Sequence, residues 1–184
     1  MKNVAFISAS TRALFTTLVL CVAASSHAQT QADYDRAKAN YTTAQLEADA
    51  LCGEASIVWG GDAAAIEKGW FDVRNEFYDK KPGGTENLTY NRSKSDIMIA
   101  GMRVAGVTNG GSLSGVAIGF EEAPETVFSK LPMNPKMIKT AEYKTEGITR
   151  WTQTKPVPRL TALSYKNFTL VSCERGENFK PKFR

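Results

Sequence analysis

Apolar side chains recur with helical spacing along the segment that follows Thr30. They stand at alternating intervals of three and four residues: Tyr34, Ala37, Tyr41, Ala44, Ala48 and Leu51. This period places them on one face of an α-helix. Thr30 can cap the first turn and Gly53 follows the last, so the pattern predicts a long helix over Gln31–Cys52. Because half of the stripe is alanine and it spans only about three heptads, we expect it to pack on the protein's own sheet and not in a coiled coil.

Beyond this segment the pattern changes to short runs that alternate apolar and polar residues or are rich in aromatic residues. Such runs are typical of β-strands, and they cover Trp70–Tyr78, Asn87–Asn91, Ile97–Ser112, Leu113–Phe120, Ile138–Trp151 and Leu160–Cys173. A short second helix is expected to begin at Ala123–Glu125, with Pro124 in its first turn, and to end before Pro132. The predicted fold class is α+β: an antiparallel sheet with a long N-terminal helix and a short second helix packed on one face.

The glycine-rich stretch at residues 106–111 resembles a phosphate-binding loop only superficially. It lacks both the GxGxxG spacing and the lysine of GxxxxGK[ST], and the run after it is strand-like. Asn109-Gly110 between two apolar runs instead predicts a tight hairpin in the middle of the sheet. Arg103, the one charge in this apolar run, is either an edge residue that reaches water or a buried cation that needs a carboxylate partner. We favour a structural role for Arg103.

The N-terminal residues have the order of charge, apolar run and small residues that is typical of a secretory signal peptide. Lys2 and Arg12 precede the apolar run Ala13–Ala24, and Ser26-His27-Ala28 fits a cleavage site. We therefore expect residues 1–28 to be removed, which leaves residues 29–184 as a single domain. No later run approaches the ~20 apolar residues of a transmembrane helix, so we expect a periplasmic or secreted protein.

Removal of the signal peptide also removes His27, the only histidine of the chain. Without imidazole, Ser-His-Asp and Cys-His catalysis are unavailable, and the commonest metal ligand is missing. We therefore expect no enzyme, no metal site and no cofactor. Cys21 leaves with the signal peptide, and the remaining Cys52 and Cys173 are expected to form a disulfide in an oxidising compartment.

A carboxylate-based hydrolase needs no histidine and stays open as one alternative. The chain offers four carboxylates for it: Glu121, Glu122, Glu142 and Glu146. Their spacing does not distinguish an acid from a base, so solvated surface glutamates are the simpler interpretation.

Charge is distributed unevenly along the predicted mature chain. Residues 29–125 contain 9 basic and 15 acidic side chains, whereas residues 126–184 contain 12 basic and 4 acidic ones. If folding keeps these two parts separate, one surface will attract anions. In the basic part, four residues around a proline-stiffened loop combine cations with a large aromatic ring, as binding hot spots do: Arg150, Trp151, Lys155 and Arg159. A buried Trp151 with ordinary surface charges around it is the simpler interpretation.

A second candidate surface is the basic tail, residues 175–184, in which cations alternate with phenylalanine. It could touch an anionic envelope polymer or a lipid surface, although a solvated terminus is the simpler interpretation. Nucleic acid is not an expected partner, because the net charge is modest and the chain is expected to be exported.

The sequence thus predicts an exported binding protein that masks a protein partner in the cell envelope, as inhibitors and immunity proteins do. The alternatives are a module for anionic glycan or lipid and a histidine-free hydrolase. Sequons that begin at Asn40, Asn87, Asn91 and Asn167 would matter only in a eukaryotic secretory route, and glycosylation stays open.

Overall fold

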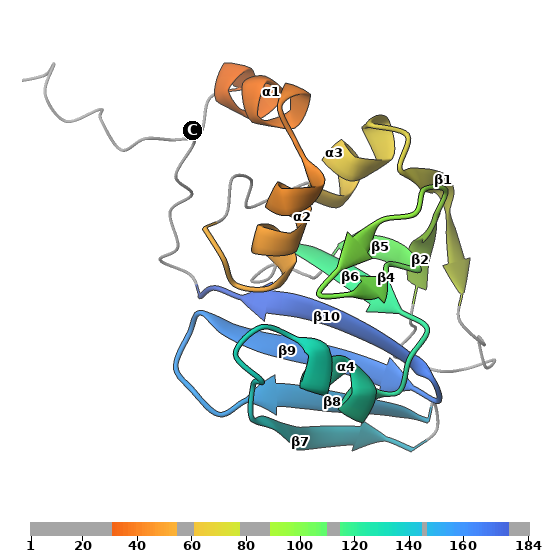
Figure 1. The fold of residues 1–184 in the computed structure, drawn as a ribbon, viewed down its shortest axis with the longest axis vertical. Helices are drawn as coiled ribbons and strands as arrows, with labels where there is room; N and C mark the ends of the chain where they lie inside the picture. Colours follow the sequence, from red (N-terminus) through yellow and green to blue (C-terminus); the bar gives the residue numbers. More distant parts are fainter. Residues whose placement is uncertain (1–30, 55–60, 78–88, 110–114, 145–146, 177–184) are drawn as a thin grey trace, which may run out of the picture.

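A computed structural model describes residues 31–54, 61–77, 89–109, 115–144 and 147–176. These residues contain four short helices: α1 (Gln31–Ala39), α2 (Thr43–Ala50), α3 (Gly61–Glu67) and α4 (Pro124–Lys130). They contain ten strands: β1 (Phe71–Phe77), β2 (Thr89–Ser93), β3 (Met98–Ile99), β4 (Met102–Arg103), β5 (Gly106–Asn109), β6 (Val116–Phe120), β7 (Met137–Tyr143), β8 (Ile148–Gln153), β9 (Arg159–Tyr165) and β10 (Phe168–Glu174) (Figure 1). The predicted signal peptide, Gly110 and residues 177–184 of the predicted tail lie outside the described residues.

Eight strands form one sheet in the order β1-β2-β5-β6-β10-β9-β8-β7, in which all neighbours are antiparallel. The two remaining strands, β3 and β4, form a separate hairpin. The predicted fold class is wrong, because the described chain is mostly antiparallel sheet with only small helices and no long N-terminal helix. Among the described residues, no helix has the length and apolar character needed to cross a membrane.

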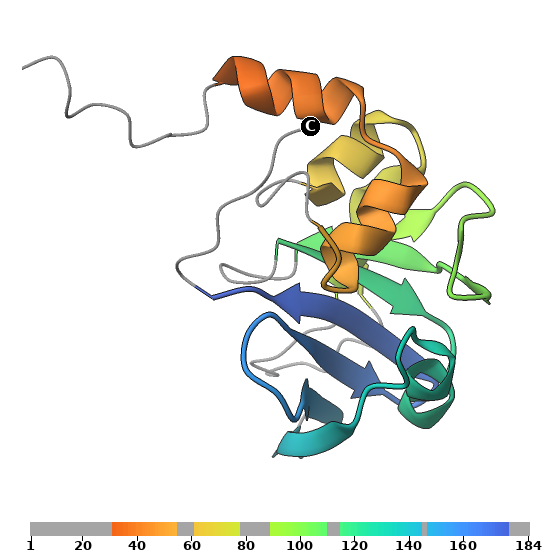
Figure 2. The ribbon, with the colours of Figure 1, turned by 60° about the vertical axis from the view of Figure 1, so that its left-hand side comes forward.

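The expected helix over Gln31–Cys52 is broken at Asn40–Thr42. Thr42 has an extended backbone, its hydroxyl accepts the Gln45 N–H, and the Gln45 side chain accepts the Thr42 N–H at 2.7 Å. This capping box starts a new helix, α2. Because the chain turns here, α1 and α2 point in different directions (Figure 2). The apolar stripe continues across a break that its period alone does not reveal.

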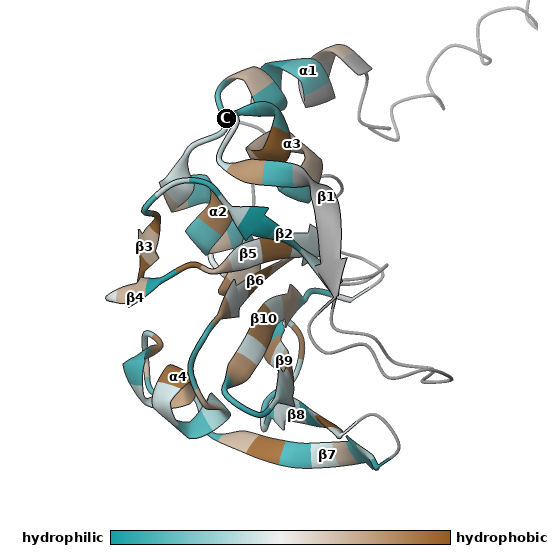
Figure 3. Ribbon diagram, turned by 90° about the vertical axis from the view of Figure 1, so that its right-hand side faces the viewer, coloured by the Kyte–Doolittle hydropathy of each residue, from teal (hydrophilic) through white to brown (hydrophobic). Residues whose placement is uncertain are grey.

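The helices cover one face of the sheet and form the main core with it. Leu46 of α2, Ala64 of α3 and Val127 of α4 are each 0% exposed and belong to one hydrophobic cluster with Ile118 and Val171 of the sheet. The central strand β6 is buried at every position. Hydropathy follows this arrangement: α1 is largely hydrophilic, and the central strands β6 and β10 are largely hydrophobic (Figure 3).

On the opposite face, two glycines make room for an aromatic pair. Gly106 of β5 lies directly opposite Gly119 of β6, and the rings of Tyr90 and Phe168 stack beside them with centroids 4.8 Å apart. A Cβ on Gly106 would lie 2.2 Å from Tyr90 Cδ2 and 2.7 Å from the carbonyl oxygen of Asn91. Gly106 is therefore needed for close packing, and the described part of the glycine-rich stretch, Gly106–Asn109, is strand β5.

The segment around Arg103 reverses direction earlier than the sequence predicts. Ala100 and Gly101, with φ of 51° and 73°, turn the chain between β3 and β4, as expected for a two-residue hairpin. Arg103 consequently lies at an exposed edge, where its guanidinium is 2.8 Å from Asp96. In the next hairpin, Asn109 pairs with Val116 as β5 and β6 run antiparallel, and Gly110, the second residue of the expected turn, lies outside the described residues.

One covalent link and one set of hydrogen bonds join the end of α2 to the end of the last strand. The disulfide between Cys52 and Cys173, with Cα atoms 5.0 Å apart, ties the end of α2 to β10 across 121 residues of sequence. Next to it, Arg175 is only 8% exposed and donates to the carbonyl oxygens of Ala48, Asp49 and Gly53 at 2.9–3.0 Å. Ala48 and Asp49 belong to the last turn of α2 and Gly53 follows it, so the guanidinium lies at the C-terminal end of the helix, where a cation is electrostatically favourable. We call this junction the α2–β10 staple.

Arg175→Ala should destabilise the protein by about 3 kcal/mol, because three carbonyl groups at the end of α2 and the charge of Asp49 lose their cationic neighbour. Arg175→Lys should recover only part of this, since an ammonium group lacks the guanidinium fork. Urea unfolding measures both changes. Arg150→Ala is the matched control: Arg150 is exposed, and its loss should change stability by less than about 0.5 kcal/mol. Equal effects of the two alanine variants would contradict the role of the staple.

Gly106→Ala should cost more stability than Gly119→Ala, within the range of about 1–3 kcal/mol typical of overpacked cores. The new methyl group at 106 meets a backbone oxygen, whereas at 119 it meets only the side-chain ends of Phe168 and Leu170, which can shift. Thermal unfolding of both variants tests this order, and a reversed order would mean that the two glycines are not held as described.

Candidate functional site

The strand order keeps the two differently charged parts of the chain apart. Strands β1, β2, β5 and β6 form one side of the sheet, and β10, β9, β8 and β7 form the other. Helices α1 and α3 lie over the first side, α2 lies over the boundary between β6 and β10, and α4 lies over the second side (Figures 1 and 2). We call α4 with β7–β10 the basic half and the remaining described elements the acidic half. The imbalance along the sequence therefore becomes a separation in space.

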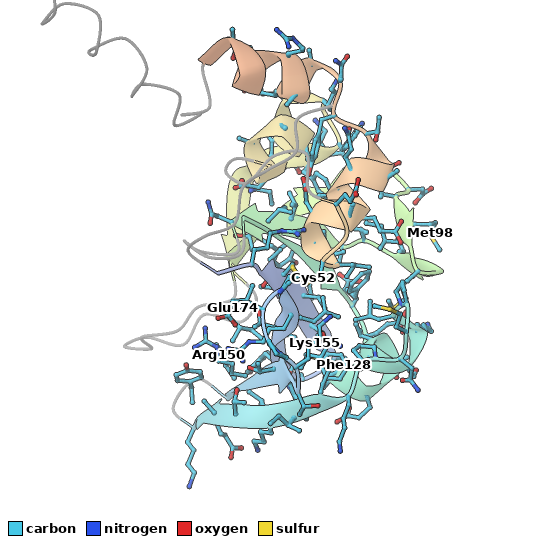
Figure 4. All side chains as sticks on the ribbon, turned by 90° about the vertical axis from the view of Figure 1, so that its left-hand side faces the viewer. Cys52, Met98, Phe128, Arg150, Lys155 and Glu174 are labelled. Atoms are coloured by element: carbon cyan, nitrogen blue, oxygen red, sulfur yellow. A yellow bond between two sulfur atoms is a disulfide. The ribbon has the colours of Figure 1, made fainter. Side chains whose placement is uncertain are left out.

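The four residues predicted to form a binding surface do not share one face of the sheet. Arg150 pairs with Leu163 and faces the side of the sheet that the helices leave uncovered. Trp151 points to the helix side, where it packs edge-on against Phe128 at 5.5 Å between centroids and donates to the Ser164 hydroxyl at 2.8 Å. Arg150 and Phe128 accordingly lie on different sides in Figure 4. Adjacent residues of one strand point in opposite directions, so Arg150 and Trp151 cannot contact the same ligand group.

Arg159 and Lys155 differ in how they are held. Arg159 makes two hydrogen bonds to Glu174, at 2.8 and 3.3 Å, and this bond raises the pKa of the guanidinium. Lys155 lies in the loop between β8 and β9, half-buried, and has no ion pair with another described residue. Of these two predicted binding residues, Lys155 is therefore the one whose charge is available for a ligand.

Two connections meet at the end of the sheet where Lys155 lies. The Thr154 N–H and hydroxyl both donate to the carbonyl oxygen of Lys136, at 3.1 and 3.4 Å. This joins the α4–β7 connection to the β8–β9 connection. We call these two segments, residues 131–136 and 154–158, the loop rim.

The loop rim combines exposed apolar side chains with cations. Met133 is 85% exposed and Val157 is 45% exposed, and Ile138, just after the rim in β7, is 45% exposed. Within the described part of the chain, Lys136 and Lys155 of the rim have no carboxylate at ion-pair distance, and neither has Arg150 in β8. In contrast, Lys130 and Lys139 pair with Glu122 and Glu142. An apolar surface bordered by cations suits an acidic protein surface.

Two of the four carboxylates predicted for hydrolysis are engaged in ion pairs. Glu122 contacts Lys130 at 2.8 Å and Glu142 contacts Lys139 at 3.0 Å. Glu121 is exposed, and Glu146 lies outside the described residues. No group of three or more metal-ligating side chains was found among the residues that the structure describes.

A buried polar cluster lies beneath the α2–β10 staple. The Tyr41 hydroxyl donates to Asp49 at 2.7 Å, and both side chains are only 2% exposed. Burial and the nearby carboxylates of Asp49 and Asp62 raise the pKa of Tyr41 far above its usual value. Burial raises the pKa of Asp62. Burial lowers the pKa of Arg175, and the charges of Asp49 and Tyr41 partly offset this lowering. Because Tyr41 and Asp49 do not reach solvent, this cluster holds the fold together and does not offer a surface for ligands.

The sequence pattern does not single out the loop rim or the buried cluster. The available signal for the rim was Leu-Pro-Met-Asn-Pro at residues 131–135, where a large apolar side chain stands in a turn between two prolines. Asp49 shares a helix with Leu46 and Ala50, but its partners Tyr41 and Arg175 lie outside that helix, so no local period connects them.

Comparisons with models of known protein families, with curated proteins and with solved structures gave no significant match. The charges, exposures and contacts of the chain itself therefore carry the functional inference.

Asp62→Asn should make the protein more stable near neutral pH. Because burial raises the folded-state pKa of Asp62 above its ordinary value of 3.8, its protonation favours folding. The stability that this group contributes is fully present below pH 3.8 and is lost as the pH rises through the folded-state pKa. The difference between variant and wild type should therefore grow from acidic to neutral pH in urea unfolding. Glu125→Gln, in the exposed first turn of α4, controls for loss of a carboxylate from a helix N-terminus, and a gap independent of pH would contradict the prediction.

Proposed function

We propose that this protein works by binding, and that it masks a protein partner outside the cytoplasm, as an inhibitor or immunity-type protein does. Export rests on the predicted signal peptide, with which the Cys52–Cys173 disulfide is consistent. The observation that supports binding most strongly is the separation of the basic half from the acidic half by the strand order.

A charged half-molecule has a direct effect on association. Complementary potentials steer an acidic partner to the basic half and mainly raise the association rate, in a way that falls with salt. Paired surface cations contribute little to such a field, because a neighbouring carboxylate cancels most of it. Lys136, Arg150 and Lys155, which lack such a neighbour among the described residues, are the side chains that a partner's carboxylates would meet.

The exposed apolar side chains of the loop rim favour a protein over an anionic glycan or a lipid surface. A glycan would gain little from Met133 and Val157. At a lipid surface, Lys136 and Lys155 contribute about 1 kcal/mol each, and burial of a methionine adds about 2 kcal/mol. Their sum, about 4 kcal/mol, corresponds to binding in the millimolar range. A shaped protein pocket can add packing and hydrogen bonds around the same groups.

The residues predicted from sequence take different parts in this proposal. Arg150 and Lys155 are contact residues, Arg150 at the uncovered face and Lys155 at the loop rim. Trp151 and Arg159 act indirectly: Trp151 anchors β8 to α4, and Arg159 ties the start of β9 to Glu174. Both therefore stiffen the strands that present the two contact cations.

Lys155→Glu should weaken capture of the partner on the order of tenfold at low salt, because it replaces attraction of carboxylates by repulsion. Lys94→Glu, which makes the same change at an exposed lysine of the acidic half, should have little effect. The measurement is affinity capture from an extracytoplasmic extract of the source organism by the mature, disulfide-bonded chain, across a salt series.

The captured material also separates the functional classes. Capture of a protein that weakens with salt and with Lys155→Glu supports the proposal. Binding that survives protease treatment of the extract favours the anionic glycan or lipid alternative. Equal loss with Lys94→Glu and Lys155→Glu, or no capture by the wild type, would contradict the proposal.

A further inference from the structure

We infer that Met133 is a pre-positioned anchor, which enters an apolar pocket with carboxylates at its edge on the protein partner. This inference rests on the proposed function and adds the chemistry of the partner's surface. It depends on three properties of the loop rim: the exposure of Met133, the way its backbone is held, and the cations beside it.

Met133 is the most exposed large hydrophobic side chain among the described residues, at 85%. Its neighbours Leu131 and Pro135 are buried. The chain therefore inserts residues on both sides of Met133 into the protein and leaves the methionine in solvent. Methionine is enriched at protein interfaces and adapts its shape to a pocket.

The backbone at Met133 is held in an unusual conformation. Met133 and Asn134 have φ of 66° and 42°, a left-handed region that side chains other than glycine rarely adopt. The Asn134 N–H donates to the carbonyl oxygen of Leu131 at 3.1 Å, and Leu131 in turn ends α4 through its N–H bond to Val127. Prolines at 132 and 135 restrict the same turn. A loop ordered before binding loses less conformational entropy when the partner arrives.

Cations beside the anchor define the edge of the pocket. Lys136 follows the turn directly, and the bonds from Thr154 to its carbonyl place the loop of Lys155 next to it. Neither lysine has an ion pair with another described residue, so a partner that covers Met133 must place acidic groups near them or leave two cations poorly solvated. The surface that fits is an apolar pocket with Asp or Glu side chains on its edge.

Photo-crosslinking tests the anchor directly. A diazirine analogue of methionine at position 133 of the mature, disulfide-bonded chain should form an adduct with one extracytoplasmic protein of the source organism. The same analogue at position 98 is the matched control, because Met98 is 58% exposed on β3 in the acidic half, far from Arg150 (Figure 4). Lys136→Glu together with Lys155→Glu should lower the yield at position 133 at least about fivefold. The crosslinked peptide should contain apolar residues and Asp or Glu.

Conventional variants measure the same contact without a crosslinker. Met133→Ala should weaken capture about tenfold or more, as expected for an interface hot spot, and Met98→Ala should leave it unchanged. Both variants should keep the unfolding midpoint of the wild type, since both side chains are exposed.

The outcomes separate this inference from the proposed function. If Lys155→Glu weakens capture but Met133→Ala does not, the anchor is wrong and the proposed function stands. If the wild type captures no protein, both fail. Adducts of equal yield from positions 133 and 98, or adducts with a second copy of this chain or with lipid, would overturn the anchor.

Discussion

The attachment of α2 to β10 is the constraint on which the rest of the molecule depends. A disulfide that closes a loop of 121 residues limits the unfolded chain and contributes on the order of 4 kcal/mol. Arg175 also fixes the orientation of α2 relative to β10, because its guanidinium donates to carbonyl groups at the C-terminal end of α2, beside that disulfide. β10 pairs with β6 on one side and β9 on the other, so the staple lies where the two parts of the chain meet.

The boundary between β6 and β10, which we call the seam, is also supported on the other face of the sheet. Tyr90 of β2 reaches across β5 and β6 to stack on Phe168 of β10, and it can do so because Gly106 and Gly119 have no side chains in between. The staple and the stack therefore hold the acidic and basic halves from opposite faces. A fixed seam keeps the two charges apart, and this separation would disappear if the strands of the two halves were interleaved.

The loop rim has features that do not serve folding. An exposed methionine, a left-handed turn of two residues that are not glycine, and lysines without carboxylate neighbours each cost stability or contribute nothing to it. They lie together on two connections that hydrogen bonds through Thr154 hold side by side. The proposed binding of a protein partner would give the chain a physical reason to keep these features.

The sequence alone was sufficient for features that depend on local period or on composition: strands in the C-terminal part, a short helix after Pro124, the cysteine pair and the uneven charge. The apolar period was misleading where a local cap competes with it, as at the Thr42–Gln45 capping box, which divides an apolar stripe that looks continuous. Only the tertiary structure decided that Trp151, and not Arg150, faces the helices, gave Arg175 its three carbonyl partners and brought residues 131–136 beside 154–158. These outcomes depend on which strands become neighbours, and pairing between distant segments leaves no periodic trace in the chain.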